Sequence, residues 1–317
     1  MSRPAACRWR RLLTSERIPV KVRSLLAGLL FVLGTVGRTA AGEAPVVVAT
    51  LAPLHSLAAF VMRGAGRPDL LLAPGVSPHF YQLRPSEARR LAEAEVILWV
   101  GPELENFLVR PLANLAPDAV RVTASRLPGI RLLPAADDAR KAPSPEAYDP
   151  HLWLDPANAR VIGEALAAVL AERDPARADL YRTNARALER ALAELRRELD
   201  SLLAPVRGRP FLVLHDAFRY FETAFGLRGL GAVTVSPERP PGPRRLAEIL
   251  RRIRREGVVC IFSEPQLRSP LLDRLVADTG VRTATLDPLG VGIDPGPELY
   301  FRLLQRNAEA VRACLGG

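Results

Sequence analysis

The sequence predicts an α/β protein of two lobes, each with a mostly parallel sheet, joined by one long helix. Short continuous apolar runs alternate with helix-like segments in both halves of the chain, which is the pattern of parallel sheets covered by helices on both faces. Between the halves, residues 175–204 read as one uninterrupted helix. The 317 residues and 48% hydrophobic content suffice for two sizeable cores.

The first 41 residues predict a secretory signal peptide. An apolar run from Leu25 to Gly37 is followed by small residues that suit cleavage near 41–44. An uncleaved anchor is the alternative, but the run is short for spanning a bilayer. The segment holds eight basic residues against one acid, hence +7 of the chain's net +10. The charge of the remainder therefore predicts no nucleic-acid partner.

Residues 45–155 are predicted to form the first lobe. Apolar runs at 46–50, 69–73 and 95–100 indicate strands, and helix-like patterns cover 53–63 and a segment that begins near Pro85. Residues 127–149 are rich in proline, alanine and charged side chains without sustained periodicity. This stretch is predicted to be a surface loop.

Two helices with matching start signals are predicted for residues 156–205. Asp155-Pro156 and Asp174-Pro175 each place a capping acid before a proline at the first helical position. Leucines then recur mostly every three or four residues until Pro205 ends the second helix. At 1.5 Å per residue this helix would be about 45 Å long, which is enough to bridge two lobes.

The alternation of strands and helices resumes in residues 206–317, the predicted second lobe. Strand-like runs lie at 211–215, 229–235, 258–263 and 281–286. Helices are predicted between them, at 243–256 and 270–278 among others, and a last helix ends at Cys314.

Three of the four histidines stand at loops or strand ends. His79 follows the run 69–73, His151 precedes the first linking helix, and His215 ends the run 211–215. Open α/β sheets bind ligands at such positions, and imidazole is the commonest transition-metal ligand. Their joint placement predicts a zinc site in a cleft, with Asp287 at another strand end as a possible oxygen ligand.

Structural roles are the alternative for each histidine. Any one of the three loop histidines alone is compatible with an ordinary hydrogen-bonded residue, and their spacing fits no short zinc motif. His55 lies in a helix-like segment with an apolar face. It is predicted to pack or hydrogen-bond structurally, the alternative being that it orients a metal ligand.

Two cysteines remain once the leader, with Cys7, is removed. Cys260 and Cys314 are an even number in a compartment where disulfides persist. They form either one disulfide or two buried thiols.

Five segments together resemble a known family. They are residues 73–108 with "APGVSPHFYQLRPSEARRL", 149–159 with "DPHLWLDPANA", 211–249 with "FLVLHDAFRYF", 260–275 with "CIFSEPQLRSP", and 285–290 with "TLDPLG". In order and spacing they resemble the zinc-binding receptors of bacterial zinc-uptake ABC transporters, a metal-receptor class of periplasmic solute-binding proteins. The resemblance covers roughly residues 45–315.

The resemblance implies a fold, a site and partners. It implies two lobes linked by a single long rigid helix, with Zn²⁺ held between them as the transported ligand. Its three histidine ligands fall on His79, His151 and His215, and Asp287 matches an acid that is the fourth ligand in some members, whereas others use water or a neighbouring glutamate. The resemblance also implies a bridged Cys260–Cys314 pair, a periplasmic location, and delivery to an inner-membrane permease with a cytoplasmic ATPase. We expect a monomer.

Two positions depart from the pattern of many relatives. Pro78 excludes the glutamate that precedes the first histidine in some of them, and the loop with Asp137, Asp138 and Glu146 contains no histidine. A metal-gathering role for this loop is therefore not predicted.

Other function classes are weaker alternatives. A manganese or iron receptor of the same class would tend to replace one histidine with a carboxylate, so the three histidines favour zinc. A secreted zinc hydrolase would need a general base near the metal, for which Glu103 and Glu222 are candidates without a supporting motif. No dinucleotide or phosphate-loop motif is present. We therefore expect a receptor and not an enzyme.

Overall fold

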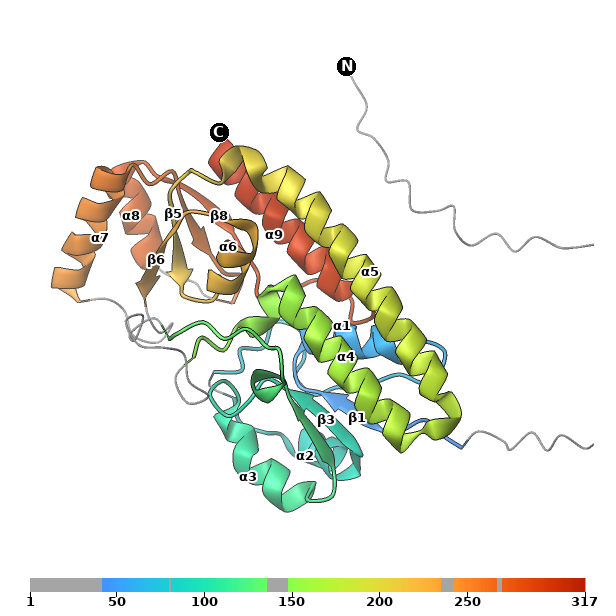
Figure 1. The fold of residues 1–317 in the computed structure, drawn as a ribbon. Helices are drawn as coiled ribbons and strands as arrows, with labels where there is room; N and C mark the ends of the chain where they lie inside the picture. The colour runs from blue at the N-terminus through green and yellow to red at the C-terminus, as the bar shows by residue number, and fades with distance from the viewer. Residues whose placement is uncertain (1–41, 80, 136–147, 235–241, 267–269, 317) are drawn as a thin grey trace, which may run out of the picture. The chain divides into compact units, whose positions relative to one another are not determined.

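Two four-stranded parallel sheets form the framework of the protein in the computed structural model, which describes residues 42–79, 81–135, 148–234, 242–266 and 270–316 (Figure 1). The first sheet has the strand order β2-β1-β3-β4 and the second β6-β5-β7-β8, and every pairing is parallel. This confirms the predicted α/β fold of two lobes. The predicted leader, residues 1–41, lies outside the described residues.

Among its described residues, the first lobe contains four strands and three α-helices. They are β1 (Val47–Ala49), α1 (Ala52–Val61), β2 (Asp69–Leu70), α2 (Pro85–Glu93), β3 (Val96–Trp99), α3 (Asn106–Leu115) and β4 (Val120–Thr123). The sequence did not predict α3 or β4. Pro111 lies inside α3, where a proline normally argues against a helix, and β4 is only four residues long and partly exposed.

Helices α4 (Pro156–Arg173) and α5 (Ala178–Leu203) link the lobes. Asp155 caps α4, because its Oδ1 accepts a hydrogen bond from the backbone N–H of Ala157 at 2.9 Å. The equivalent prediction for Asp174 is wrong. A 3₁₀ turn at Pro175–Arg177 intervenes before α5, and the Asp174 carboxylate accepts instead from Arg177 and Tyr181.

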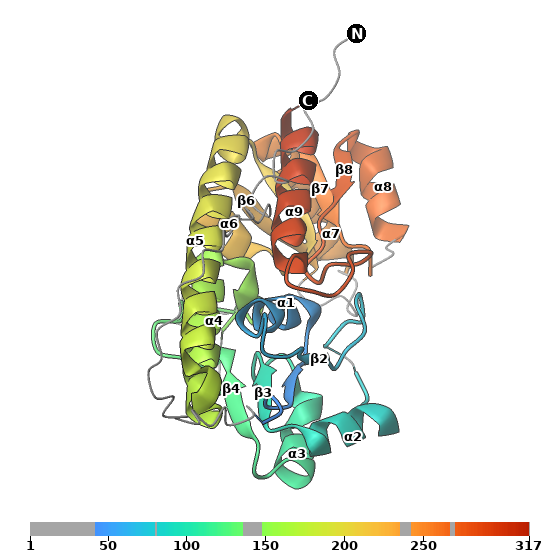
Figure 2. The same ribbon diagram turned by 90° about the vertical axis from the view of Figure 1, so that its right-hand side faces the viewer.

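Helix α5 is the long bridging element. Its 26 residues correspond to about 39 Å, somewhat shorter than expected because of the preceding 3₁₀ turn. It packs against α1 of the first lobe and against α6 and α9 of the second, and Figure 2 shows it running alongside both. Its buried stripe includes Leu188, Leu192, Leu195 and Leu199, as the leucine periodicity predicted.

The second lobe follows the predicted order of elements. It contains β5 (Phe211–His215), α6 (Arg219–Phe225), β6 (Gly229–Thr234), α7 (Pro243–Glu256), β7 (Cys260–Ser263), α8 (Pro270–Thr279), β8 (Arg282–Thr285) and α9 (Leu299–Gly316). Side chains along β5 alternate between its faces. Leu212 and Leu214 join a core with α7 and α8, whereas Phe211 and Val213 join the main core with α6 and α9.

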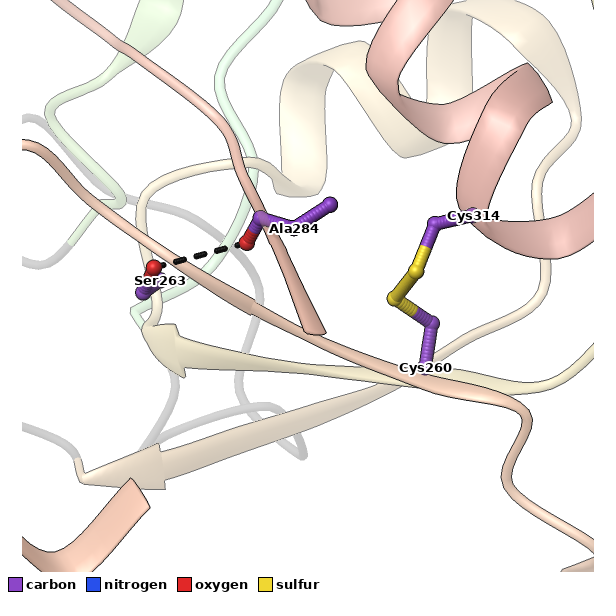
Figure 3. The surroundings of a disulfide bond; sticks show 4 residues. All are labelled: Cys260, Ser263, Ala284 and Cys314. Carbon is purple, nitrogen blue, oxygen red and sulfur yellow. Dashed lines mark hydrogen bonds between the residues drawn. A yellow bond between two sulfur atoms is a disulfide. The ribbon is translucent and has the colours of Figure 1, made fainter. Parts of the chain in front are cut away.

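A disulfide joins Cys260, at the start of β7, to Cys314 in α9 (Figure 3). Both residues are buried. This confirms the disulfide over the alternative of two free thiols. Further along β7, the Ser263 hydroxyl lies 3.4 Å from the Ala284 carbonyl oxygen of β8.

The two lobes share one apolar core and several hydrogen bonds. Tyr300, in α9, is buried and donates two hydrogen bonds to the first lobe. Its backbone N–H donates to the Ser56 hydroxyl of α1 at 2.9 Å, and its own hydroxyl donates to the Trp153 carbonyl at 2.8 Å. The start of α9 is therefore tied to the first lobe. The exact lobe boundaries at 155 and 205 stay a prediction. No helix among the described residues is long and apolar enough to span a membrane.

Candidate metal centre

Three imidazoles from distant parts of the sequence converge at the facing ends of the two sheets. His79 lies in the loop after β2, His151 precedes a 3₁₀ turn at Leu152–Leu154, and His215 is the last residue of β5. Their ring centroids are 5.1–5.4 Å apart, and one nitrogen from each lies within 4.8 Å of the others. The structure thus brings together the three histidines predicted from the sequence.

The separation of two of these nitrogens suits a common ion. The Nε2 atoms of His79 and His151 are 3.3 Å apart. Two nitrogens bound to one zinc ion at about 2.0–2.1 Å, with tetrahedral angles between them, would be about 3.3–3.4 Å apart. The donor set therefore has the chemistry of a tetrahedral zinc site, and the His79–His151 pair has its spacing.

Asp149 holds His151 in place. One carboxylate oxygen, Oδ1, accepts from the backbone N–H of His151 at 3.0 Å and lies 2.8 Å from its Nδ1. With Nδ1 engaged, Nε2 is the nitrogen that faces His79. Burial is the main reason that the pKa of His151 lies well below its ordinary value, with the nearby His215 adding to the effect. His151 is therefore neutral and ready to bind a cation at neutral pH.

Glu264 holds His215 in place in the same way. Its Oε1 lies 2.9 Å from Nδ1 of His215, and both side chains are buried. Burial opposes the charged form of His215, but the hydrogen bond and charge of Glu264, together with nearby carboxylates, raise its pKa overall. A proton therefore competes with a metal ion at His215 more strongly than at His151.

A small pocket surrounds the three histidines. Trp153 forms part of its wall, with its ring centroid 5.5 Å from that of His151, and its indole N–H donates to the Pro288 carbonyl at 2.8 Å. Gln266 and Leu289 also line the pocket. The Trp153–Pro288 bond joins the His151 loop of one lobe to the loop after β8 of the other.

Comparison with known proteins identifies the family. A family model described as "Zinc-uptake complex component A periplasmic", ZnuA, matches residues 47–314. The chain belongs to the ZnuA family. It is therefore a zinc-binding periplasmic receptor by family, as its sequence segments predicted.

Individual ZnuA proteins are similar to this chain along nearly their whole length. The protein named "High-affinity zinc uptake system protein ZnuA" of Brucella abortus is 35% identical over 93% of this chain and 98% of its own. The protein of the same name from Yersinia pestis is 36% identical over 85% of this chain and 91% of its own.

Solved structures share the fold. A crystal structure of ZnuA has a TM-score of 0.74 at 22% identity and covers 86% of this ZnuA-family chain and 100% of its own. A Zn(II)-bound mutant variant of AdcAII from Streptococcus pneumoniae has a TM-score of 0.72 at 25% identity. The match covers 85% of this chain and 99% of the AdcAII chain. FpvC of Pseudomonas aeruginosa, in complex with Mn²⁺, has a TM-score of 0.75 at 23% identity. The match covers 86% of this chain and 99% of the FpvC chain.

Asp287 does not join the histidine group in this ZnuA-family protein. Its carboxylate accepts from the backbone N–H groups of Leu289 at 2.9 Å and Val291 at 2.5 Å, and from the Gln266 side chain at 3.2 Å. These bonds shape the loop that carries Pro288 and Leu289 into the pocket wall. Asp287 as the fourth ligand stays a prediction.

His55 has a structural environment. It is buried in α1, and its Nε2 lies 3.0 Å from the Pro68 carbonyl oxygen. Burial lowers its pKa. This fits the first of the two sequence interpretations, a histidine that packs and hydrogen-bonds within its own lobe.

The sequence interpretation missed the two carboxylates that orient the histidines. Asp149 stands two residues before His151, and Glu264 follows directly after β7, so a search for acids beside candidate ligands and at strand ends could have found both. Neither candidate base of the hydrolase alternative, Glu103 or Glu222, lines the pocket.

Proposed function

We propose that this protein captures one Zn²⁺ ion in the periplasm through Nε2 of His79, His151 and His215, and delivers it to the permease of an ABC-type importer. The observation that carries the proposal is the convergence of three imidazoles, two of which have Nδ1 beside a buried carboxylate. Such pairing fixes the ring orientation and increases the basicity of the metal-binding nitrogen.

The fourth coordination position is open to water or to Asp287. Asp287 could reach the ion only if its loop moved, because its two oxygens accept hydrogen bonds from Leu289 and Val291 in the structure described here. Three neutral imidazoles favour zinc over manganese and iron, which prefer more carboxylate ligands. The proposal therefore names zinc as the cargo.

Binding without turnover is part of the proposal. A zinc hydrolase needs a base next to the metal-bound water. Asp149 and Glu264, which contact the histidines, are already hydrogen-bonded to ligand nitrogens, which suits orientation of the ligands better than proton transfer to water.

We propose that residues 1–41 direct export and are then removed, and that the mature protein works as a monomer with an inner-membrane permease and its cytoplasmic ATPase. The family's periplasmic description supports the location.

Metal analysis of the mature protein, purified from the periplasm, tests the function. We expect one zinc per chain, retained against a chromogenic chelator in competition titrations, and no hydrolysis of ester or peptide substrates. Tighter binding of Mn²⁺ than of Zn²⁺ would overturn the choice of metal, and metal-dependent hydrolysis would favour the enzyme alternative.

A further inference from the structure

Helix α7 concentrates the positive charge of the mature chain. Residues 42–317 hold 36 basic and 33 acidic residues, a net charge of +3. Helix α7 alone has six arginines and two glutamates, a net charge of +4. The rest of the mature chain is therefore close to neutral, at −1, and this one helix is its strongly basic element.

The arginines lie on the outer side of α7. Its inner side packs on the second sheet through Ile249 and Ile253. Next to the edge strand β6, a groove has an apolar floor of Leu212, Ala232 and Ile249 and is lined by Arg245, Glu248, Arg251, Arg252 and Arg255 of α7. We call this hollow the α7 groove.

Few acids neutralise these arginines. Glu248 lies 3.6 Å from both Arg244 and Arg245, and Glu256 is shared between Arg228 and Arg255. Arg251 and Arg252 have no carboxylate partner within the part of the chain that the structure describes. Ion pairs between solvent-exposed side chains such as these contribute little to stability.

Helix stability does not explain the whole pattern. Cations in the last turn, such as Arg254 and Arg255, interact favourably with the helix dipole, but cations in the first turn do not. Arg244 and Arg245 stand in the first turn. Their placement opposes the dipole, and only Glu248, one helical turn further on, offsets it.

The groove begins at the metal end of the second lobe. In a parallel α/β sheet, a helix that connects two strands starts near the carboxyl ends of the strands. His215 pairs with Thr234 at that end, and α7 begins soon after Thr234 in the sequence. Helix α7 lies on the side of the sheet away from α5 and α9, the helices that back both lobes (Figures 1 and 2).

We propose that the α7 groove docks on an acidic surface of the membrane permease that receives the zinc. This inference rests on the proposed function, since a receptor that delivers its cargo must dock. Guanidinium groups pair with carboxylates in a two-pronged geometry, and complementary charge accelerates encounter. Arg245, Arg251 and Arg255 are exposed and Arg252 is half-buried beside them, so carboxylate side chains of a protein surface can reach all four, including the half-buried one, by entering the groove.

The test compares two variants of the mature, zinc-loaded protein with equal charge changes. One carries R245Q, R252Q and R255Q in the groove. The control carries R186Q, R190Q and R197Q, which are exposed on one face of α5. Stimulation of ATP hydrolysis is measured with the cognate permease–ATPase complex in proteoliposomes, at low salt and at 0.3 M salt, after thermal unfolding and zinc titration have shown both variants to be folded and metal-bound.

The groove variant should need about tenfold or more protein for half-maximal stimulation at low salt, and the difference should shrink at high salt. The α5 control should match the wild type. Equal behaviour of the two variants would overturn the proposal. Binding of the wild type to anionic vesicles without the transporter, as tight as to the proteoliposomes, would also overturn it in favour of a lipid surface. A wild type that binds no zinc would instead refute the proposed function.

Discussion

Glu264 should control zinc affinity through His215 without touching the ion. The variant Glu264→Gln keeps the shape of the side chain and an acceptor oxygen 2.9 Å from Nδ1 of His215, but removes its negative charge. A charged hydrogen bond contributes about 1 kcal/mol more than a neutral one. Removing the carboxylate partner of a metal-bound histidine typically weakens metal binding about 10- to 100-fold. We expect the lower end of this range, about tenfold, because Gln can still accept.

Competition titration with a chromogenic chelator at pH 8 measures this effect. A matched control is Glu105→Gln, because Glu105 is also a buried glutamate but accepts from the backbone of Val100 and Gly101, away from the histidines. Its zinc affinity should equal that of the wild type.

A double-mutant cycle makes the prediction specific. In a His215→Ala background, Glu264→Gln should have almost no further effect on zinc affinity, since the imidazole that it orients is gone. An unchanged affinity in the single variant, or an equal loss in both backgrounds, would refute the reasoning that Glu264 acts through His215.

Four further predictions follow from the same contacts. His151→Ala should weaken zinc binding by orders of magnitude in the same titration, and an unchanged affinity would remove His151 from the site. Because the pKa of His215 is raised, zinc affinity should fall as the pH decreases towards 6.5, with release of a proton that calorimetry in two buffers would detect. Burial raises the pKa of Glu105 to about 7, so the stability of the wild type relative to Glu105→Gln should fall by up to about 3 kcal/mol between pH 4.5 and pH 7, as denaturant titrations would show. Replacing Cys260 and Cys314 with serine opens a loop with a sequence separation of 54 and should cost about 4 kcal/mol in thermal unfolding.

Local signals predicted most of the fold. Helix α7 was predicted at 243–256 and is observed there, because Pro243 starts it and Gly257, with φ of 63°, ends it in a conformation that glycine adopts readily. The short strand β4 and the helix α3 gave no such signals. Asp174 carries a start signal but binds Arg177 and Tyr181 instead, since a nearby guanidinium and hydroxyl compete with the backbone for its carboxylate.

Sequence by itself determined which residues are available to the site. Histidine is rare in this chain, and its positions at loops and strand ends were enough to predict His79, His151 and His215. Their spacing along the sequence does not predict how far apart they lie in space, because the chain between them can take many paths.

Only the tertiary structure decided how these residues are oriented. Glu264 reaches His215 across a sequence separation of 49, and Trp153 reaches the Pro288 carbonyl across 135. The sheets bring these groups together, since adjacent parallel strands end at one edge. Asp287 shows the same limit: its position after β8 is compatible with a ligand, but its carboxylate accepts from the amides of its own loop. Hydrogen-bond partners are chosen by distance in space, which residue identity alone does not encode.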